Sequence, residues 1–274
     1  MKLWLAALCL ALAGGSAQAG CGADPEPCRL ADGEYHALLP KAGGQGAPVV
    51  LWLHGAGSNG GNAVRNAALM EALTGRGYAV LAPTGSRQFG ERGASWNFLP
   101  GWEGRDETDF LRRAVADASA RFGTDAKSVL LAGFSAGGFM VTYLACTAPE
   151  TFAAYAPVSG GFWRPLPDGC AGPVRLFQTH GWADRTVPLE GRVLRSGEFE
   201  QGDIFQGMEL WRQANGCAGQ DPTAYGETGI FWRRKWEDCA AGSALELALF
   251  PGGHTVPEGW VDMVLDWFES LEIP

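Results

Sequence analysis

The stretch that decides the fold is "VLLAGFSAGGFM", residues 129–140. It places Ser135 between two glycines, after an apolar run typical of a buried strand and before a run of small and apolar residues typical of a packed helix. Gly133 and Gly137 relieve crowding at a tight turn, and the amides that open the helix point towards the serine hydroxyl. A Gly-x-Ser-x-Gly sequence in this strand–turn–helix setting predicts that Ser135 is a nucleophile. The alternative is an idle serine at a crowded turn, so the rest of the chain must supply its partners.

Strand and helix patterns alternate on both sides of this turn. Apolar runs predict strands at residues 48–53, 78–82, 128–132, 153–158, 174–179 and 245–250, and periodic apolar positions predict helices at 63–73, 106–122, 136–146 and around 260–271. This alternation predicts an α/β fold with a mostly parallel central sheet covered by helices on both faces. Residues 35–39 are expected to add an antiparallel edge strand.

The N-terminus predicts export. A lysine at position 2, a short apolar run over residues 3–13 and the sequence Ala17-Gln18-Ala19 are typical of a secretory signal peptide, which we expect to be cleaved after Ala19. Lipid anchoring at Cys21 is the less favoured alternative, because Gln18 occupies a position where a lipoprotein signal has an aliphatic residue. We therefore expect residues 1–19 to be the signal peptide, residues 20–274 to form one catalytic domain, and the protein to be secreted or periplasmic.

The charge of the chain argues against two classes of partner. Its formal net charge is −9, and removal of the signal peptide with its one lysine leaves 20 − 30 = −10. An acidic surface disfavours binding to nucleic acid or to an anionic membrane. The apolar run of the signal peptide is too short to span a bilayer, and no other segment of the sequence has the pattern of a membrane span. A small or oligomeric substrate is therefore the expected partner, and the sequence does not indicate an oligomeric state.

Six cysteines remain after removal of the signal peptide, an even number that predicts three disulfides in an oxidising compartment. Six cysteines allow 15 connectivities. We expect the local pairs Cys21–Cys28, Cys146–Cys170 and Cys217–Cys239. No Cys-x-x-Cys pair or histidine cluster accompanies them, so neither a metal site nor a cofactor is predicted.

A serine nucleophile needs a base, and the chain contains four histidines. His36 lies on the expected edge strand, His54 is expected to brace the loop that it opens, and His180 ends a strand as a turn residue. His254 lies in a loop between the last strand and the last helix, which is where a hydrolase with this order of elements carries its base. His254 is therefore the predicted base, against the alternative of an ordinary loop residue.

The base in turn needs an acid that fixes its tautomer. Asp184 follows the strand at residues 174–179, in the expected chain order between serine and histidine. Asp168, Asp203 and Asp221 are the competing aspartates. Asp168 precedes the strand, and Asp203 opens a predicted helix that it would cap. Asp184 is therefore the predicted acid, although an ordinary turn aspartate would look the same.

Acyl transfer also needs donors for the developing oxyanion. The backbone amide of Ala136 is one candidate, because it follows the nucleophile. The second donor is expected in the loop after the strand at residues 48–53, with Ala56 best placed. Gly55 and Gly57 remain alternatives.

The motifs taken together resemble a known family. "LHGAGSNG", "SWNF", "DETDFL", "GFSAGGFM", "HGWADRTVP", the pair Trp211 and Cys217, and "PGGHTVPEGW" are similar to sequences of secreted esterases known as polyhydroxybutyrate depolymerases and feruloyl esterases. The resemblance extends from about Tyr35 to Leu271. It implies the α/β-hydrolase fold, the triad Ser135, Asp184 and His254, and an oxyanion loop at Ala56.

Two departures from this family affect the expected substrate. Many members have a bulkier residue or a cysteine at the position of Ala56, and a smaller residue at that of Trp182. Trp182 lies two residues before Asp184, so we expect it to wall an acyl or aromatic pocket. Trp96, in another loop, is a second expected substrate-binding residue, whereas Trp211 and Trp267 are expected in the core.

These observations predict a secreted serine carboxylesterase that acts through an acyl-enzyme on short hydroxyalkanoate oligomers or feruloyl-type aromatic esters. The alternatives are a serine peptidase on the same fold and a catalytically silent binding protein of the envelope. No linker or adsorbing module is recognised, so we expect soluble esters to be hydrolysed faster than crystalline polymer.

Overall fold

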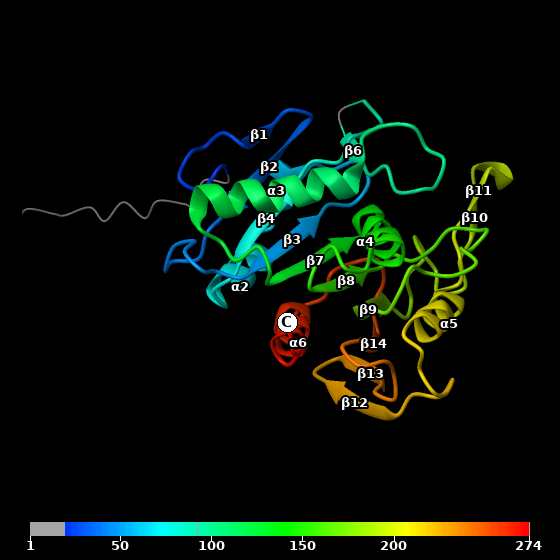
Figure 1. Ribbon diagram of the computed structural model, residues 1–274. Coiled ribbons are helices and arrows are strands. Elements are labelled where there is room, and N and C mark those ends of the chain that lie inside the picture. The colour runs from blue at the N-terminus through cyan, green and yellow to red at the C-terminus, as the bar shows by residue number, and fades with distance from the viewer. Residues whose placement is uncertain (1–19, 92, 274) are drawn as a thin grey trace, which may run out of the picture.

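The computed structural model describes residues 20–91 and 93–273, and the expected signal peptide with its cleavage site lies outside them. The fold is built on a ten-stranded sheet with the order β1-β2-β4-β3-β7-β8-β9-β14-β13-β12 (Figure 1). Its strands are β1 (Cys28–Leu30), β2 (Gly33–Leu38), β3 (Val49–Leu53), β4 (Ala79–Pro83), β7 (Val129–Phe134), β8 (Ala154–Val158), β9 (Arg175–Gly181), β12 (Ala224–Thr228), β13 (Phe231–Trp236) and β14 (Ala244–Phe250).

Six α-helices and two short ribbons complete the described residues. The helices are α1 (Gly60–Ala63), α2 (Ala67–Gly75), α3 (Glu107–Phe122), α4 (Ala136–Thr147), α5 (Ile204–Ala214) and α6 (Trp260–Glu269). One ribbon pairs β5 (Arg87–Phe89) with β6 (Gly93–Ser95), and the other pairs β10 (Val193–Leu194) with β11 (Phe199–Glu200), which a 3₁₀ turn at Arg195–Gly197 connects.

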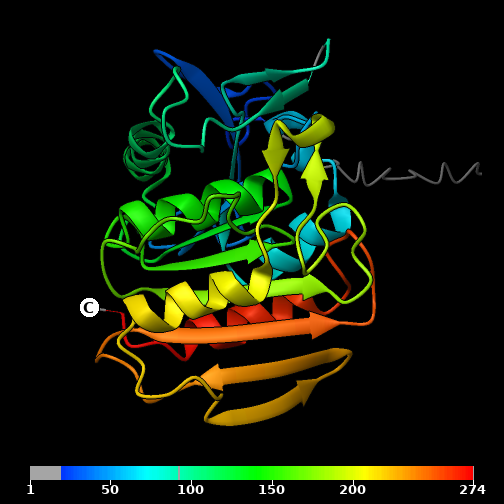
Figure 2. The same ribbon diagram turned by 90° about the vertical axis from the view of Figure 1, so that its right-hand side faces the viewer.

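The predicted parallel sheet between two helical layers is confirmed. Strands β4, β3, β7, β8, β9 and β14 run parallel, and the antiparallel strands lie outside them. Helices α3, α4 and α5 cover one face and α2 and α6 the other (Figures 1 and 2). Strand β3 supplies both cores, because Leu51 packs with the first layer and Val50 with the second. This two-sided burial explains why the strands are continuously apolar.

Three details differ from the sequence-based expectation. The strand expected at the edge pairs antiparallel with β4, but β1 lies outside it, so it is not an edge strand. The helix expected over residues 63–73 begins only at Ala67, as α2, and the residues before it form the separate short helix α1, because Asn59 and Asn66 each cap a helix. Strand β12 was not predicted. By contrast, Asp203 accepts a hydrogen bond from the Gln206 amide as the predicted cap of α5.

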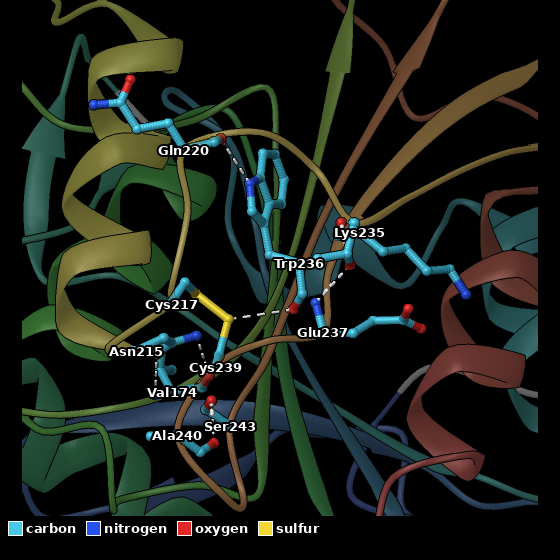
Figure 3. The surroundings of a disulfide bond; sticks show 11 residues. Val174, Asn215, Cys217, Gln220, Lys235, Trp236, Glu237, Cys239, Ala240 and Ser243 are labelled. Atoms are coloured by element: carbon cyan, nitrogen blue, oxygen red, sulfur yellow. Dashed lines mark hydrogen bonds between the residues drawn. A yellow bond between two sulfur atoms is a disulfide. The ribbon is translucent and has the colours of Figure 1, made fainter.

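The structure joins the same three cysteine pairs that were expected: Cys21–Cys28, Cys146–Cys170 and Cys217–Cys239. Figure 3 shows the last of these, which joins Cys217, three residues after α5, to Cys239, three residues after β13. In the described part of the chain, no helix is both long enough and apolar enough to span a bilayer.

The turn between β7 and α4 brings backbone segments unusually close together. Ser135 has φ 57° and ψ −116°, and its amide donates to the Val158 carbonyl at 2.9 Å. A Cβ atom added at Gly133 would lie 2.7 Å from the Gly137 backbone, and one added at Gly137 would lie 2.2 Å from the Leu53 carbonyl oxygen. Both glycines are therefore required by close approach. The strained serine conformation is typical of a nucleophile at this position.

We predict that Gly137→Ala destabilises the protein by about 1–3 kcal/mol, because the added methyl group meets backbone atoms that cannot move aside. The matched control is Gly75→Ala at the end of α2, where an added Cβ has open space. It should be neutral or stabilise by about 0.5 kcal/mol. Urea unfolding of the two variants measures the difference, and equal stabilities would contradict the steric account.

Candidate active site

The structure brings the three predicted residues Ser135, His254 and Asp184 into one hydrogen-bonded row. His254 Nε2 lies 2.9 Å from Ser135 Oγ, and His254 Nδ1 lies 2.8 Å from Asp184 Oδ2. Because an ionised carboxylate only accepts hydrogen bonds, the Nδ1–H donates to Asp184. Nε2 of the neutral imidazole is then the acceptor for the serine hydroxyl, which is the tautomer that a general base requires.

Each of these side chains comes from a loop at the carboxyl edge of the parallel sheet. Ser135 follows β7, Asp184 follows β9, and His254 follows β14. The two latter loops are joined directly, because the Trp182 amide donates to the Phe250 carbonyl at 2.8 Å. The contact holds the loops of Asp184 and His254 in register, since β9 and β14 are themselves hydrogen-bonded neighbours.

The carboxyl group of Asp184 is buried and is kept ionised by its surroundings. Burial raises its pKa, but the hydrogen bonds from His254 and from the Val187 and Thr186 amides outweigh this effect, and the pKa falls to about 2. The two amides donate to Oδ1 at 2.9 and 2.8 Å. The other oxygen is thus left to accept from His254.

His180 hydrogen-bonds to the loop that carries Asp184, and its position is not that of the predicted base. Its side chain is fully buried, and its Nε2–H donates to the Val187 carbonyl at 2.7 Å. The Gln178 amide lies 3.4 Å from the other ring nitrogen. Burial lowers the pKa of His180, so it stays neutral 3.8 Å from Asp184 Oδ2. The predicted role of a structural turn residue agrees with these contacts.

The loop that was expected to complete an oxyanion hole lies against the serine. A Cβ added at Gly55 would be 3.5 Å from Ser135 Cβ. The amide of Gly57 donates to the Ala94 carbonyl at 2.9 Å, which removes this alternative. The amides of Ala56 and Gly55 remain candidates from this loop, with Ala136 at the start of α4 as the second donor.

His54 holds the loop in place, as expected. Its Nδ1–H donates to the Gly55 carbonyl at 2.8 Å, and its Nε2 accepts from the Gly85 amide at 3.1 Å. Burial lowers the pKa of His54 to about 4, although the bond to Gly55 opposes the shift. Both nitrogens are therefore used to position backbone, and the ring carries no charge at neutral pH.

The prediction that Trp96 binds substrate is wrong. Trp96 is completely buried, its indole N–H donates to the His54 carbonyl at 2.8 Å, and its ring packs against the His54 ring at 4.9 Å. A side chain without accessible surface cannot contact a substrate. Its contribution is to brace the loop that contains Ala56.

Two hollows lie at this end of the sheet. One, of about 400 Å³, is lined by His254, Ala56, Phe134 and Val256 among others. Phe134 and Val256 were missed by the sequence analysis, because nothing in a local pattern shows which loop side chains face a hollow. Trp182 lines a different hollow of about 490 Å³ and is 61% exposed. The structure thus does not place it in the hollow beside His254.

No group of three or more histidine, cysteine, aspartate or glutamate side chains in residues 20–91 and 93–273 is arranged to hold a metal ion.

The low pKa of Asp184 predicts how it contributes to stability. A carboxyl group whose pKa is depressed on folding stabilises the protein above the unfolded-state pKa of about 3.9, and this contribution is lost as the pH falls through about 2. Asp184→Asn should therefore unfold more easily than wild type at pH 6, and the difference should narrow near pH 2. Thermal unfolding of both proteins across this range is the measurement. A difference that does not change with pH would contradict an ionised Asp184.

Known proteins place the chain in a family. Residues 34–195, more than half of the chain, match the family described as "Putative esterase". Feruloyl esterase C of Emericella nidulans is 26% identical over 77% of this chain and 78% of its own length. Feruloyl esterase B of Piromyces equi is 26% identical over 68% of this chain, which spans 35% of that longer relative. Poly(3-hydroxyalkanoate) depolymerase C of Paucimonas lemoignei is 33% identical over 43% of this chain and 29% of its own.

Solved structures support the same fold. Acetyl xylan esterase from Aspergillus awamori superposes with a TM-score of 0.62 at 17% identity, covering 87% of this chain and 94% of its own. Esterase PE8 superposes with a TM-score of 0.56 at 20% identity, covering 88% and 99%. The family match, which includes Ser135 and Asp184, identifies the chain as a member of the esterase family, a carboxylic-ester hydrolase, and the two solved structures show that it shares the α/β-hydrolase fold.

Proposed function

We propose that this esterase is a secreted serine hydrolase in which Ser135 is the nucleophile, His254 the general base and Asp184 the acid that orients it. The observation that carries the proposal is the unbroken row of hydrogen bonds from Ser135 Oγ through His254 to Asp184. A serine hydroxyl is a weak nucleophile, and this arrangement is what activates it.

The geometry supports an acyl-enzyme mechanism. As Ser135 Oγ attacks the ester carbonyl carbon, His254 Nε2 takes the hydroxyl proton, and the Asp184 carboxylate stabilises the imidazolium. The Ala136 amide and an amide of the Ala56 loop stabilise the negative charge on the carbonyl oxygen. Collapse of the tetrahedral intermediate expels the alcohol, which receives the proton from His254. A water molecule, deprotonated by His254, then releases the acid and restores Ser135.

We propose short hydroxyalkanoate oligomers or feruloyl-type aromatic esters as substrates. The relatives that carry this choice are named feruloyl esterases and a poly(3-hydroxyalkanoate) depolymerase. The hollow beside His254 is within the usual size range of small-molecule sites, and Phe134 and Val256 give it an apolar wall.

We further propose that the protein is exported, either to the periplasm or out of the cell. Three disulfides among the six cysteines of residues 20–273 support this, because such bonds persist in oxidising compartments. The predicted cleavage after Ala19 belongs to the same proposal. A catalytically silent envelope protein is the less favoured function, since it would not need a strained serine aligned with a histidine and a buried aspartate.

Ser135→Ala and His254→Ala should each lower kcat on p-nitrophenyl butyrate by about 10⁴-fold or more, since removal of a triad member leaves only oxyanion stabilisation and binding. A fluorophosphonate probe should label the wild type and not Ser135→Ala. Ser243→Ala, on an exposed turn beyond β13, is the matched control and should keep wild-type activity and labelling. Labelling that persists in Ser135→Ala would show that the nucleophile is elsewhere.

A further inference from the structure

Three large aromatic side chains lie exposed together at the end of the sheet. Trp182, Tyr225 and Trp232 are 61%, 71% and 46% exposed, and they line the hollow of about 490 Å³ together with Glu227 and Arg234. We call these five residues the aromatic platform. Exposed tryptophans are uncommon, because burying such a large ring stabilises a fold more than burying most other side chains does. The cluster therefore requires an explanation other than folding.

The register of the β12–β13 hairpin puts four of these side chains on one face. Trp232 pairs with Glu227, and Arg234 pairs with Tyr225. Directly opposite residues, and residues two apart along a strand, point to the same side of a sheet. Each of the two rings on the hairpin therefore has a charged side chain across from it.

This face of the hairpin is covered at one end only. Trp236 shares it with Trp232, yet Trp236 is 5% exposed and its indole N–H donates to the Gln220 carbonyl at 3.0 Å (Figure 3). The segment that covers Trp236 begins at Cys217, which the disulfide to Cys239 holds in place. Trp232, nearer the hairpin turn, has no such cover among the described residues.

The platform continues from the candidate active site. Trp182 follows β9 directly and precedes Asp184 by two residues, and Trp232 pairs with Leu249, five residues before His254. Figure 2 shows the hairpin turn on the same side of the sheet as the carboxyl ends of β9 and β14. A long substrate whose ester group reaches Ser135 can therefore extend over the acid loop towards the hairpin.

The hairpin is held rigidly enough to act as a preformed surface. Arg233, on its opposite face, donates to Glu246 of β14 and to Thr228. Phe231 packs against Phe250 on that same face at 6.1 Å between ring centroids. A preformed aromatic surface loses little side-chain entropy when it binds a ligand.

The chemistry of the platform indicates a neutral ligand with both apolar and hydroxyl-bearing surfaces. Glu227 and Arg234 have opposite charges, which disfavours a strongly anionic or cationic partner, and both can hydrogen-bond to hydroxyl groups. The rings offer flat faces for stacking. A polyester surface would instead be matched by a continuous apolar patch. Sugar rings have apolar C–H faces and hydroxyl edges, so they fit both parts of the platform.

We propose that the aromatic platform binds the neutral sugar chain of a polysaccharide whose ester group is hydrolysed at Ser135. This inference rests on the proposed function, because it assigns the class of substrate that the site receives. Rings spaced along the hairpin and the acid loop would contact several sugar units away from the scissile ester.

The test is affinity electrophoresis of the full-length mature protein in gels containing soluble arabinoxylan or β-glucan. Wild type should be retarded by at least one of these two polysaccharides. Trp232→Ala combined with Tyr225→Ala should weaken this binding about tenfold, or about 1.4 kcal/mol, because two of the three rings of the platform are lost. Phe205→Ala, which removes a 40% exposed ring from α5, is the matched control and should bind as wild type does.

A second measurement separates the inference from the proposed function. The ratio of kcat/KM on feruloylated arabinoxylan to that on methyl ferulate should fall about tenfold in the double variant and stay unchanged in Phe205→Ala. If the wild type hydrolyses methyl ferulate but binds neither polysaccharide, the assignment of the platform as a sugar-binding surface is overturned and the proposed function is not. Retention on poly(3-hydroxybutyrate) granules instead, or a dimer abolished by the double variant, would also overturn this assignment. Polysaccharide binding without any ester hydrolysis would support the platform and overturn the proposed function. Circular dichroism shows whether the variants are folded.

Discussion

The close approach of helix α4 to the sheet is the constraint on which the rest of the structure depends. At Gly138 an added Cβ would lie 2.7 Å from the Val158 carbonyl oxygen, and at Gly160 one would lie 2.3 Å from the Gly138 backbone. Together with Gly133 and Gly137, these glycines let the start of α4 sit directly on β3 and the end of β8. The serine at the turn is consequently held in an unusual backbone conformation, with its side chain lifted to the carboxyl edge where the other loops meet.

The positions of Asp184 and His254, the proposed acid and base, depend on a second arrangement, the pairing of β9 with β14. These strands are far apart in the sequence but adjacent in the sheet, so their loops leave the edge side by side. Asp184 can be buried there because three donors compensate its charge, and an ionised carboxylate in such a place is costly without them. Its orientation is then fixed from both sides, which in turn fixes the ring of His254.

The sequence could predict the main features of the site because they follow from chain order and strand position. Ser135, Asp184 and His254 each follow an apolar strand, and parallel strands bring such positions to one edge. The tryptophans could not be assigned in this way. Trp96 and Trp182 each directly follow a strand, yet the first is enclosed by the His54 loop and the second faces solvent. Exposure of a loop side chain is set by segments distant in the sequence. Strand β12 was missed for a similar reason, because its sequence, AYGET, has little apolar alternation and pairs only through β13.

The three histidines at this edge of the sheet show how the proposed base differs from the two histidines that support the structure. His54 and His180 each direct an N–H at a backbone carbonyl, and the remaining ring nitrogen faces an amide group, from the backbone in one case and from Gln178 in the other. His254 directs its N–H at a carboxylate, and its remaining nitrogen faces a hydroxyl group. An amide proton is not transferred at neutral pH, whereas a serine hydroxyl proton can be taken once the imidazolium is stabilised by Asp184. Histidine side chains thus have two different roles at this edge of the sheet, structural support and the proposed base. The group that faces the acceptor nitrogen determines the role of each ring.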